Sequence, residues 1–458
     1  MRWLALFPLI SSIAFAQLSA APTFESVMPP MGTAPVRWPD VAATGAAGFL
    51  AVSGAGNVMA QRFDLDGHPV GGAFAVNSDM LLAQAPRVAF APLIGASLVA
   101  WHASISMTQT QLRGRLVRID GSTVGNDFDI SSPGTNWEMG AALAWSSAQQ
   151  TFLVAWQNSA TQIKAQRVSA NGQKVGGELT IDSSASYERD PAVGYDAQAD
   201  QFVVAYAGCV ANDDCFARAQ RINAADGALV GGPLILEASI TAGYVPELAY
   251  DAAQKRFLAV WYVPGALHAR TLAADGTLGP TRIASAMYAA YDANSVAWSP
   301  ISGTFVVVTH GTAQDVAVEL DATGAPLGAY VLWGPDGVSG NFNPRIAASA
   351  SRAEFLGVTS TAFGSLSAQR LISTERLSLV DAGVETDGGA RPAGDAGSSG
   401  SDAGTSPSDG GTPGNISGGT ACGCSGVDAS VMCVVLLVWC VRRRFDRTAF
   451  ALDARASE

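Results

Sequence analysis

The stretch PELAYDAAQKRFLAVW, residues 246–261, consists of two short apolar segments joined by five small or polar residues. The pattern recurs in seven copies between residues 38 and 372, and most copies continue with an Ala-Gln-Arg-Val-like segment, a Gly-containing turn and an apolar end. The last residue of the second segment recurs every 48 to 55 residues, at Ser53, Trp101, Trp156, Tyr206, Trp261, Thr309 and Thr359. A repeat of this length with four short apolar segments is typical of a β-propeller blade.

The repeats therefore predict an all-β fold, a seven-bladed β-propeller of four-stranded antiparallel blades within residues 17–380. We place the repeats at about 38–76, 85–130, 138–181, 189–236, 245–283, 292–330 and 343–380. The last repeat has three clear strands, and residues 373–380 form only a weak fourth. Phe24 to Met28 offers an alternative outer strand that would join the two ends of the ring and cover an exposed sheet edge. A six-bladed ring with one degenerate unit also fits.

The turn between the third and fourth strands, c and d, is the clearest local signal. It reads Asp-Gly or Asn-Gly in the first five units, starting at Asp66, Asp120, Asn171, Asp226 and Asp275. A two-residue hairpin turn needs positive φ at both positions, which these pairs adopt at low cost. Asp64 and Asp66 also resemble the start of a calcium loop, but the further oxygen ligands do not follow. We interpret these residues as turns and expect no metal and no cofactor.

The b-to-c and d-to-a connections vary in length, whereas the a-to-b and c-to-d turns are short. In a propeller the two variable connections emerge on the same face, which we call the variable face. Loops on a rigid scaffold are where binding residues concentrate. The variable face is therefore the predicted functional surface.

Residues 1–16 have the composition of a secretory signal peptide, with Arg2, an apolar run and Ala14-Phe15-Ala16 before the cleavage point. Export fits the pair Cys209 and Cys215, which are separated by five residues within one loop. In an oxidising compartment such a pair favours a local disulfide. A metal site is the alternative, but it would need more ligands, and no His lies in that stretch.

The C-terminal region changes composition abruptly. Residues 381–420 are rich in Gly, Ser, Asp and Ala and predict a disordered acidic linker. Residues 421–444 contain Cys422 and Cys424, a hydrophobic segment and Arg442-Arg443-Arg444, and residues 445–458 would form a cytoplasmic tail. Together these features predict a membrane helix or a sorting signal.

The linker, cysteine motif, hydrophobic segment and Arg cluster resemble the MYXO-CTERM sorting tail of myxobacterial surface proteins. By that resemblance a membrane protease would cut the chain near Cys422 or Cys424 and display the protein at the cell surface. The chain departs from the pattern in continuing past Arg444 and in having extra cysteines in the apolar run, Cys433 and Cys440. A permanent single-span anchor is the alternative.

Composition and motifs exclude several functions. The formal net charge is −12, and Lys and Arg form no cluster outside the extreme C-terminus, which argues against a nucleic-acid partner. No nucleophile elbow, phosphate-binding loop or Cys/His pair is present, so we assign no catalytic residue. His102 and His310 follow strand b in two units and are interpreted as exposed loop residues rather than metal ligands.

One position of strand a carries an unusual set of side chains. The residue after its Pro, or after the equivalent of that Pro, should surround the mouth of the central channel: Asp40, Arg87, Ala142, Ala192, Glu247, Ser295 and Arg345. If the ring closes, Arg345, Asp40 and Arg87 are neighbours. They form either an ion cluster that satisfies itself or a binding site for an anionic or sugar ligand.

The repeat region resembles bacterial surface β-propellers in architecture, without matching a family of known activity. We expect a secreted propeller, tethered at the cell surface or outer membrane or released after processing. It would bind an extracellular protein or polysaccharide through the variable face, with Asp40, Arg87, Glu247 and Arg345 as candidate ligand-binding residues. A propeller polysaccharide hydrolase or lyase with carboxylates at the channel mouth is the alternative.

Overall fold

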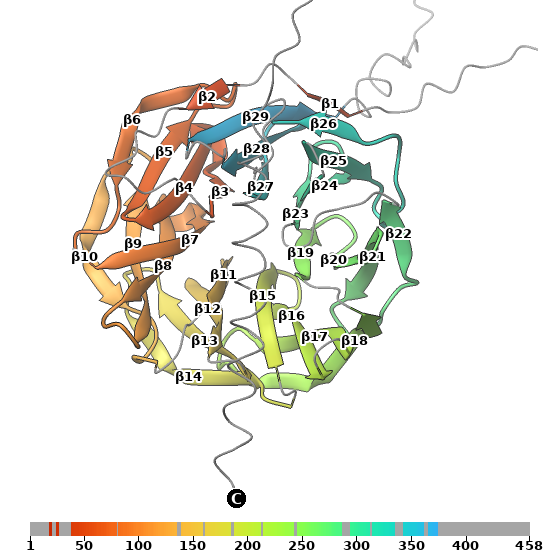
Figure 1. Ribbon diagram of the computed structural model, residues 1–458, viewed down its shortest axis with the longest axis horizontal. Coiled ribbons are helices and arrows are strands. Elements are labelled where there is room, and N and C mark those ends of the chain that lie inside the picture. Colours follow the sequence, from red (N-terminus) through yellow and green to blue (C-terminus); the bar gives the residue numbers. More distant parts are fainter. Residues whose placement is uncertain are drawn as a thin grey trace, which may run out of the picture. The chain divides into compact units, whose positions relative to one another are not determined.

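The computed structural model describes residues 18–20, 24–26, 38–79, 81–134, 139–158, 161–184, 187–211, 214–241, 245–285, 294–311, 314–334, 342–360 and 365–373. They belong to one compact unit, residues 1–385. They confirm the all-β prediction: seven antiparallel blades of four strands surround a central axis (Figure 1). Within these residues no helix is long and apolar enough to cross a membrane. The predicted signal peptide, linker, hydrophobic segment and tail lie outside them.

The first three blades follow the repeat pattern in order, from the innermost strand a to the outermost strand d. Blade 1 has β3 (Asp40–Ala43), β4 (Phe49–Gly56), β5 (Val58–Phe63) and β6 (Pro69–Ala75). Blade 2 has β7 (Leu82–Ala91), β8 (Ala96–Ser104), β9 (Thr110–Arg118) and β10 (Thr123–Asp129). Blade 3 has β11 (Met139–Ser146), β12 (Thr151–Asn158), β13 (Gln162–Ser169) and β14 (Lys174–Asp182). Two short 3₁₀ turns, η1 (Gly45–Ala47) and η2 (Pro92–Ile94), occupy a-to-b turns.

The remaining blades repeat this order. Blade 4 has β15 (Tyr187–Asp196), β16 (Gln201–Ala211), β17 (Asp214–Asn223) and β18 (Leu229–Thr241). Blade 5 has β19 (Glu247–Asp251), β20 (Arg256–Val263), β21 (Ala266–Ala273) and β22 (Arg282–Ser285). Blade 6 has β23 (Asn294–Ser299), β24 (Thr304–His310), β25 (Asp315–Leu320) and β26 (Val331–Trp333). Blade 7 has β27 (Phe342–Ala348), β28 (Glu354–Ser360) and β29 (Leu366–Ile372).

The outer strand of blade 7 comes from the start of the chain. Strands β1 (Ser19–Ala20) and β2 (Phe24–Ser26) both pair antiparallel with β29. Their pairing joins the two ends of the ring and covers the edge that β29 would otherwise expose. The prediction that Phe24 to Met28 pairs there is confirmed as far as Ser26, and the six-bladed alternative is wrong. Residues 374–380 of the other predicted strand lie outside the described part.

Packing between blades supplies the core. Each of the seven seams between neighbouring blades holds its own hydrophobic cluster. At the seam that closes the ring, Phe49 of blade 1 packs with Leu356 and Val358 of blade 7. Strand b carries the Phe-Leu-Val-Ala-Trp pattern because it lies between two seams, and β12 is buried from Thr151 to Gln157. Burial on both faces explains its continuous apolar run.

The Gln of the Ala-Gln-Arg segment compensates for a β-bulge in strand d. In blades 1, 3 and 4 the register of strands c and d shifts next to Val-Gly-Gly, whose first Gly has positive φ. The bulge takes carbonyl groups out of the regular ladder. The Gln side-chain amide lies 2.9 to 3.5 Å from three of these carbonyl oxygens in each blade, from Gln61, Gln166 and Gln220. The motif therefore stabilises the blade rather than binding a ligand.

In blades 1, 3, 4 and 7 the Arg after this Gln links the blade to the next one. Its guanidinium donates to a backbone carbonyl of the following blade's c-to-d turn: Arg62 to Asp120 at 3.0 Å, Arg167 to Ala225 at 2.6 Å and Arg221 to Ala274 at 2.7 Å. At the closing seam the equivalent Arg370 contacts Asp66 at 3.2 Å. At these four seams the Arg therefore adds a polar contact to the hydrophobic packing between neighbouring blades.

Candidate functional site

Strand a lies innermost in every blade and begins at the end where the b-to-c and d-to-a connections emerge (Figure 1). The seven predicted positions near its start surround the central axis, and we call them the inner ring: Asp40, Arg87, Ala142, Ala192, Glu247, Ser295 and Arg345. Four of these residues are charged. They come from blades 1, 2, 5 and 7, so the ring combines residues that are far apart in the sequence.

A recurrent backbone kink precedes the inner ring. In five blades the residue two positions before the ring residue has positive φ, between 46° and 62°: Trp38, Ala85, Asp190, Val245 and Asn343. Each is followed by a proline. Such a φ is rare outside glycine, and a β-branched residue such as Val245 adopts it only when the surroundings enforce it. In blades 2, 4 and 7 the kink lies within strand a, where the register with strand b shifts, and in blades 1 and 5 it comes just before that strand.

Arg345 and Glu247 form an ion pair across the inner ring, with Arg345 Nη1 donating to Glu247 Oε1. The two residues belong to blades 7 and 5, on either side of Ser295 of blade 6. Burial acts to lower the pKa of Arg345, but the charges of Glu247 and Asp40 outweigh it and hold the pKa above its usual value. The charges of this pair therefore compensate each other within the ring.

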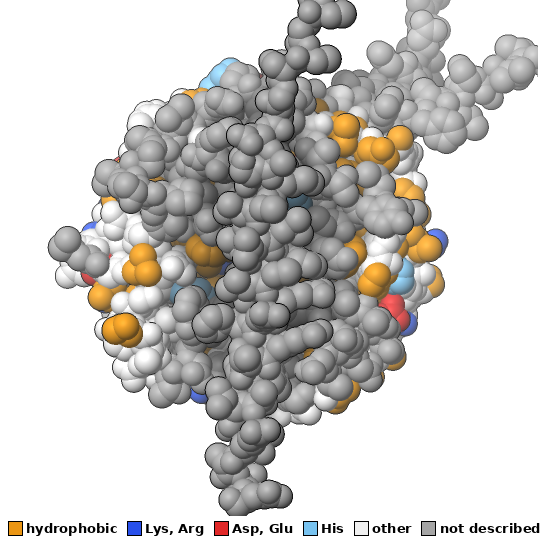
Figure 2. Space-filling view, viewed as in Figure 1, with side chains coloured by type: hydrophobic (Ala, Val, Ile, Leu, Met, Phe, Trp, Pro, Cys, Tyr) orange, Lys and Arg blue, Asp and Glu red, His pale blue; other side chains and the backbone are white. Residues whose placement is uncertain are grey.

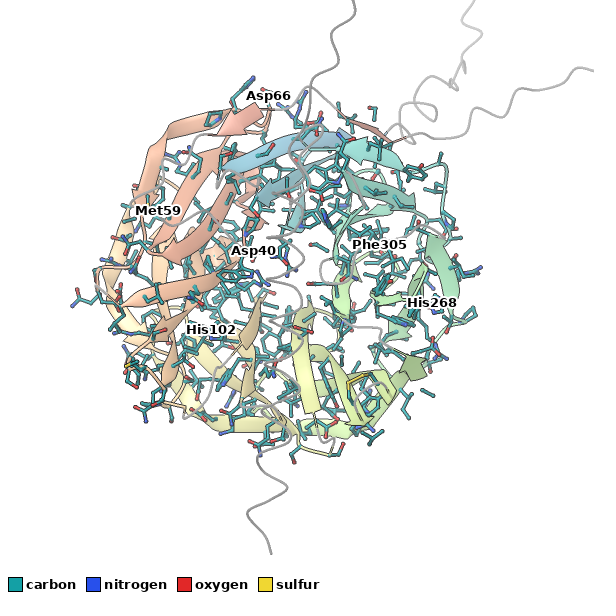
Figure 3. The ribbon with its side chains drawn as sticks, viewed as in Figure 1. Asp40, Met59, Asp66, His102, His268 and Phe305 are labelled. Carbon is teal, nitrogen blue, oxygen red and sulfur yellow. A yellow bond between two sulfur atoms is a disulfide. The ribbon has the colours of Figure 1, made fainter. Side chains whose placement is uncertain are left out.

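Asp40 is positioned by a backbone contact with the next blade. Its Oδ2 accepts a hydrogen bond from the backbone N–H of Val88 at 2.8 Å. Its negative charge acts to raise the pKa values of both Arg87 and Arg345, although other effects lower the pKa of Arg87 overall. The charges of the three residues expected to be neighbours at the closed ring therefore interact. Figure 3 shows Asp40 at the inner edge of blade 1.

Arg87 differs from Arg345 because no carboxylate of the described chain lies within ion-pair distance of it. Its Nε donates to the carbonyl oxygen of Ala141 in blade 3 at 3.1 Å, and its Nη1 lies 3.5 Å from that of Pro86. Burial and then the charge of Arg345 lower the pKa of Arg87 to about 10, against the opposing effect of Asp40, Glu247 and Asp190. The positive charge of Arg87 is thus only partly compensated.

His102 lies close to Arg87, and the expectation that it is an exposed loop residue is wrong. Strand β8 continues to Ser104, so His102 is a strand residue with 5% of its surface exposed. Both ring nitrogens are buried without a hydrogen-bond partner among the described residues. Burial and the nearby charge of Arg87 lower the pKa of His102 to about 3, so the ring is neutral at pH 7. Figure 3 shows it farther from the axis than Asp40.

Two further buried polar groups near the start of strand a lack partners. Asn294, which precedes Ser295 and is 2% exposed, makes no hydrogen bond to the described part of the chain through either side-chain amide atom. The Nε atom of Arg345 is also buried and unpaired. Leaving such a group unsatisfied costs about 1–3 kcal/mol. These groups give the inner-ring end of the propeller unused hydrogen-bonding capacity, which the sequence did not reveal.

The predicted disulfide between Cys209 and Cys215 is confirmed. The two residues are not confined to a loop, because they oppose each other on β16 and β17. Strand β16 has 11 residues, whereas the equivalent β24 of blade 6 has 7. The disulfide therefore staples an extended hairpin of blade 4 on the variable face.

Two other polar clusters have structural partners. Asp64, Asp66 and His68 place one ligand atom each within 4.8 Å of one another, at the c-to-d turn of blade 1. Asp64 Oδ1 instead accepts from the backbone N–H groups of Asp66 and His68, and Asp66 pairs with Arg352 at 2.6 Å. These contacts are those of a turn at a blade seam, as the sequence analysis proposed.

His310, the second histidine expected in a loop, ends strand β24. Its Nδ1 lies 2.9 Å from Oδ1 of Asp315, the residue opposite it on β25. It is therefore a strand-end residue with a carboxylate partner rather than a loop residue. It belongs to blade 6 and His102 to blade 2, so the two histidines do not share a site.

Both carboxylates of the inner ring already have hydrogen-bond partners. The carboxylate of Glu247 is paired with Arg345, and that of Asp40 accepts a backbone hydrogen bond. Figure 2 shows small, separate groups of hydrophobic side chains around the coloured part of one face, with few charged ones.

Comparisons with known proteins add only a distant likeness in fold. No protein-family model matches the sequence, and no curated protein is significantly similar to it. A crystal structure of a protein of unknown function from Dyadobacter fermentans is 9% identical, with a TM-score of 0.49, over 65% of this chain and 96% of that one. The Dos1 propeller is 11% identical, with a TM-score of 0.46, over 77% and 94%. A mutant of AofleA from Arthrobotrys oligospora is 12% identical, with a TM-score of 0.42, over 63% and 83%.

The class of this protein therefore follows from its own architecture. It is a seven-bladed β-propeller, a fold that serves in general as a binding or scaffold module.

Proposed function

We propose that this protein is an exported, surface-tethered propeller that binds an extracellular protein or polysaccharide through the variable face. The observation that carries the proposal is the inner ring. It brings charged residues from blades 1, 2, 5 and 7 to one end of the axis and leaves Arg87 without an ion-pair partner in the described chain. Partly unsatisfied polar groups on a rigid scaffold are a common basis for ligand recognition.

A polysaccharide hydrolase or lyase at the same position has weaker support. Such an enzyme needs two carboxyl groups that act as acid and base or nucleophile on either side of the scissile bond. Asp40 and Glu247 are instead engaged with the Val88 backbone and with Arg345. Their contacts suit positioning of a ligand better than proton transfer.

Export and tethering rest on the sequence at the two ends of the chain. The secretory composition of residues 1–16, the acidic linker and the hydrophobic segment followed by Arg442-Arg443-Arg444 support them. The disulfide in blade 4 fits an oxidising compartment. Protease treatment of intact cells tests this part of the proposal. Degradation of the propeller without cell lysis is expected, and full protection would contradict surface display.

Binding through the variable face can be tested with four exposed apolar residues. Met107 is 101% exposed and lies on the b-to-c connection of blade 2, and Val210 is 58% exposed and lies at the end of β16, next to that connection in blade 4. Leu93 and Ile119 are 63% and 44% exposed and lie on the opposite turns. The purified protein would be screened on an array of polysaccharides and surface proteins. Met107→Glu and Val210→Glu should weaken binding, and Leu93→Glu and Ile119→Glu should not. The reverse pattern would place the binding surface on the other face.

A further inference from the structure

Arg87 and His102 lie on the same side of blade 2. Residues Leu98 and Ala100 of β8 pack into the seam with blade 3, and His102 is two residues further along the same side of this strand. Arg87 is paired with Ala100 in the sheet and reaches the carbonyl oxygen of Ala141 in blade 3. The two side chains are therefore diagonal neighbours, a separation that long side chains can span.

His102 provides no negative charge behind Arg87. Its imidazole is buried and neutral, and neither nitrogen has a partner. The backbone carbonyl of Ala141 fixes the Nε side of the Arg87 guanidinium. The Nη2 atom makes no hydrogen bond within the described chain and Arg87 is half-buried rather than fully buried, so we take the outer edge of the guanidinium as the part open to a ligand. An arginine held on one side and free on the other is a preorganised receptor for a planar anion.

We propose that the outer edge of Arg87 binds the carboxylate of an acidic polysaccharide, so that a uronate residue of the chain occupies the inner ring. The proposal rests on the function proposed above and names the ligand class for the same site. Arg87 contacts the ligand. His102, whose nitrogens are shielded from solvent, lies behind Arg87 and does not.

The surroundings of Arg87 favour a sugar acid over other anions. Asp40, Glu247 and Asp190 all act electrostatically on Arg87, and this negative charge would repel a dianion more than a monoanion. Carboxylate oxygens can in turn accept hydrogen bonds from sugar hydroxyl groups. A uronate combines one negative charge with several hydroxyl groups. Its carboxylate could pair with Arg87, which has no ion-pair partner in the described chain, and its hydroxyl groups could donate to the neighbouring carboxylates. A peptide carboxyl terminus offers fewer donors.

Matched sugars test the proposal on the unmodified protein. Glucuronate and galacturonate would be titrated beside glucose and galactose, which differ from them only at C6, with imidazole NMR as the readout. The chain has four histidines, so the His102 signals can be identified from their loss in His102→Gln. Both the uronates and a polyuronate should shift the His102 signals, because neutralising Arg87 changes the field at this ring. Equal shifts with neutral sugars, or none with the uronates, would overturn the proposal.

Two variants distinguish a specific contact of the ligand with Arg87 from a general effect of the protein's charge on binding. Arg87→Gln should weaken polyuronate binding at least about tenfold, because a charge-assisted hydrogen bond is lost. Arg118→Gln makes the same change at an exposed position on the opposite face and should leave binding unchanged. Thermal unfolding of both variants shows whether they fold, and the sugar titration of the unmodified protein does not depend on them.

Two other outcomes would also overturn the proposal. Preferential binding of an acetylated peptide with a free carboxyl terminus, compared with its amidated form, would replace the polysaccharide by a protein ligand. If a neutral ligand binds and its binding survives Arg87→Gln, a uronate is excluded as the ligand class, but the variable face remains the binding surface. The array result alone decides whether the protein binds an extracellular ligand at all.

Discussion

Arg370 of the last blade and Asp66 of the first are 304 residues apart in the sequence, yet Nη1 and Oδ1 lie 3.2 Å apart across the closing seam. Asp66 also accepts from Arg352, and the hydrogen bond from Arg352 holds the pKa of Asp66 below its usual value. The side chain of Asp66 is 52% exposed, so solvent screens both pairs. The hydrophobic cluster and the N-terminal strands must therefore provide most of the closing stability.

Removing a buried side chain at the N-terminal strands should destabilise the ring. Leu18 is 3% exposed and packs in the cluster between blades 6 and 7. Leu18→Ala should lower the free energy of unfolding by about 2–4 kcal/mol, because a buried leucine leaves a cavity. Urea denaturation measures the change. Leu93→Ala, at a residue 63% exposed, should stay within about 0.5 kcal/mol, and an equal loss in both variants would contradict docking of Leu18.

The Gln of the Ala-Gln-Arg segment should matter for stability and not for binding. Gln166→Leu removes the amide that contacts three carbonyl oxygens around the bulge of blade 3. We expect a loss of about 1–3 kcal/mol, since buried carbonyl groups lose their donor. Gln173→Leu makes the same change at an exposed residue of the adjacent turn and serves as the control in chemical denaturation. A loss of ligand binding by folded Gln166→Leu protein would argue against a purely structural motif.

Acid should weaken the seam between blades 3 and 4 through Asp182. Burial raises the pKa of this carboxyl, but hydrogen bonds from Tyr206, Ser184 and Arg218 outweigh burial and lower it. A lowered folded-state pKa adds stability above the unfolded-state value, and this contribution is lost as the pH falls through the folded-state value. The free energy of unfolding should therefore decline below about pH 5. Asp182→Asn should lower the free energy of unfolding by about 1–3 kcal/mol at pH 7 and make its decline with falling pH shallower. If the pH dependence is unchanged in this variant, other groups cause the decline.

Breaking the disulfide should loosen blade 4 locally. Cys209 and Cys215 close a short loop, for which the chain-entropy estimate is about 2 kcal/mol. Replacing both residues by Ser should speed backbone hydrogen exchange in β16 and β17 and leave blades 1 and 7 unchanged. Mass spectrometry of peptides from the two regions makes the comparison. Uniformly faster exchange would show that the disulfide supports the whole ring.

The sequence predicted the blades well because each repeat is nearly complete in itself. The turn pairs such as Asp226-Gly227 lie where expected, but only the Gly has positive φ, 84° at Gly227. The prediction of two-residue turns with positive φ at both positions is therefore wrong, because the connections are longer, as between β17, which ends at Asn223, and β18, which begins at Leu229. Closure by the N-terminal segment was also predictable, because the last repeat lacked a clear fourth strand. The roles of Gln166 and Arg167 were not predictable, since the first depends on a bulge and the second on the neighbouring blade.

The inner ring could be predicted only in part. Equivalent positions in the repeats brought Asp40, Arg87 and Arg345 together, because ring order follows sequence order. The pairing of Arg345 with Glu247 was missed, because it passes over blade 6 and depends on side-chain reach. His102 was misplaced because β8 continues beyond the repeated apolar segment. Its burial depends on blade 3, which no local pattern in blade 2 reveals.

The shared last blade has a consequence for how the molecule is made. Strands β1 and β2 are synthesised first, but their partner β29 is synthesised more than 300 residues later. Strands β1 and β2 therefore remain unpaired until nearly the whole propeller has been synthesised. The ring of blades can close only after that point. Truncation before β29 would remove the partner of the first strands as well as the end of the chain. Such a fragment would remain an open arc with two unprotected edges, which makes it prone to aggregation.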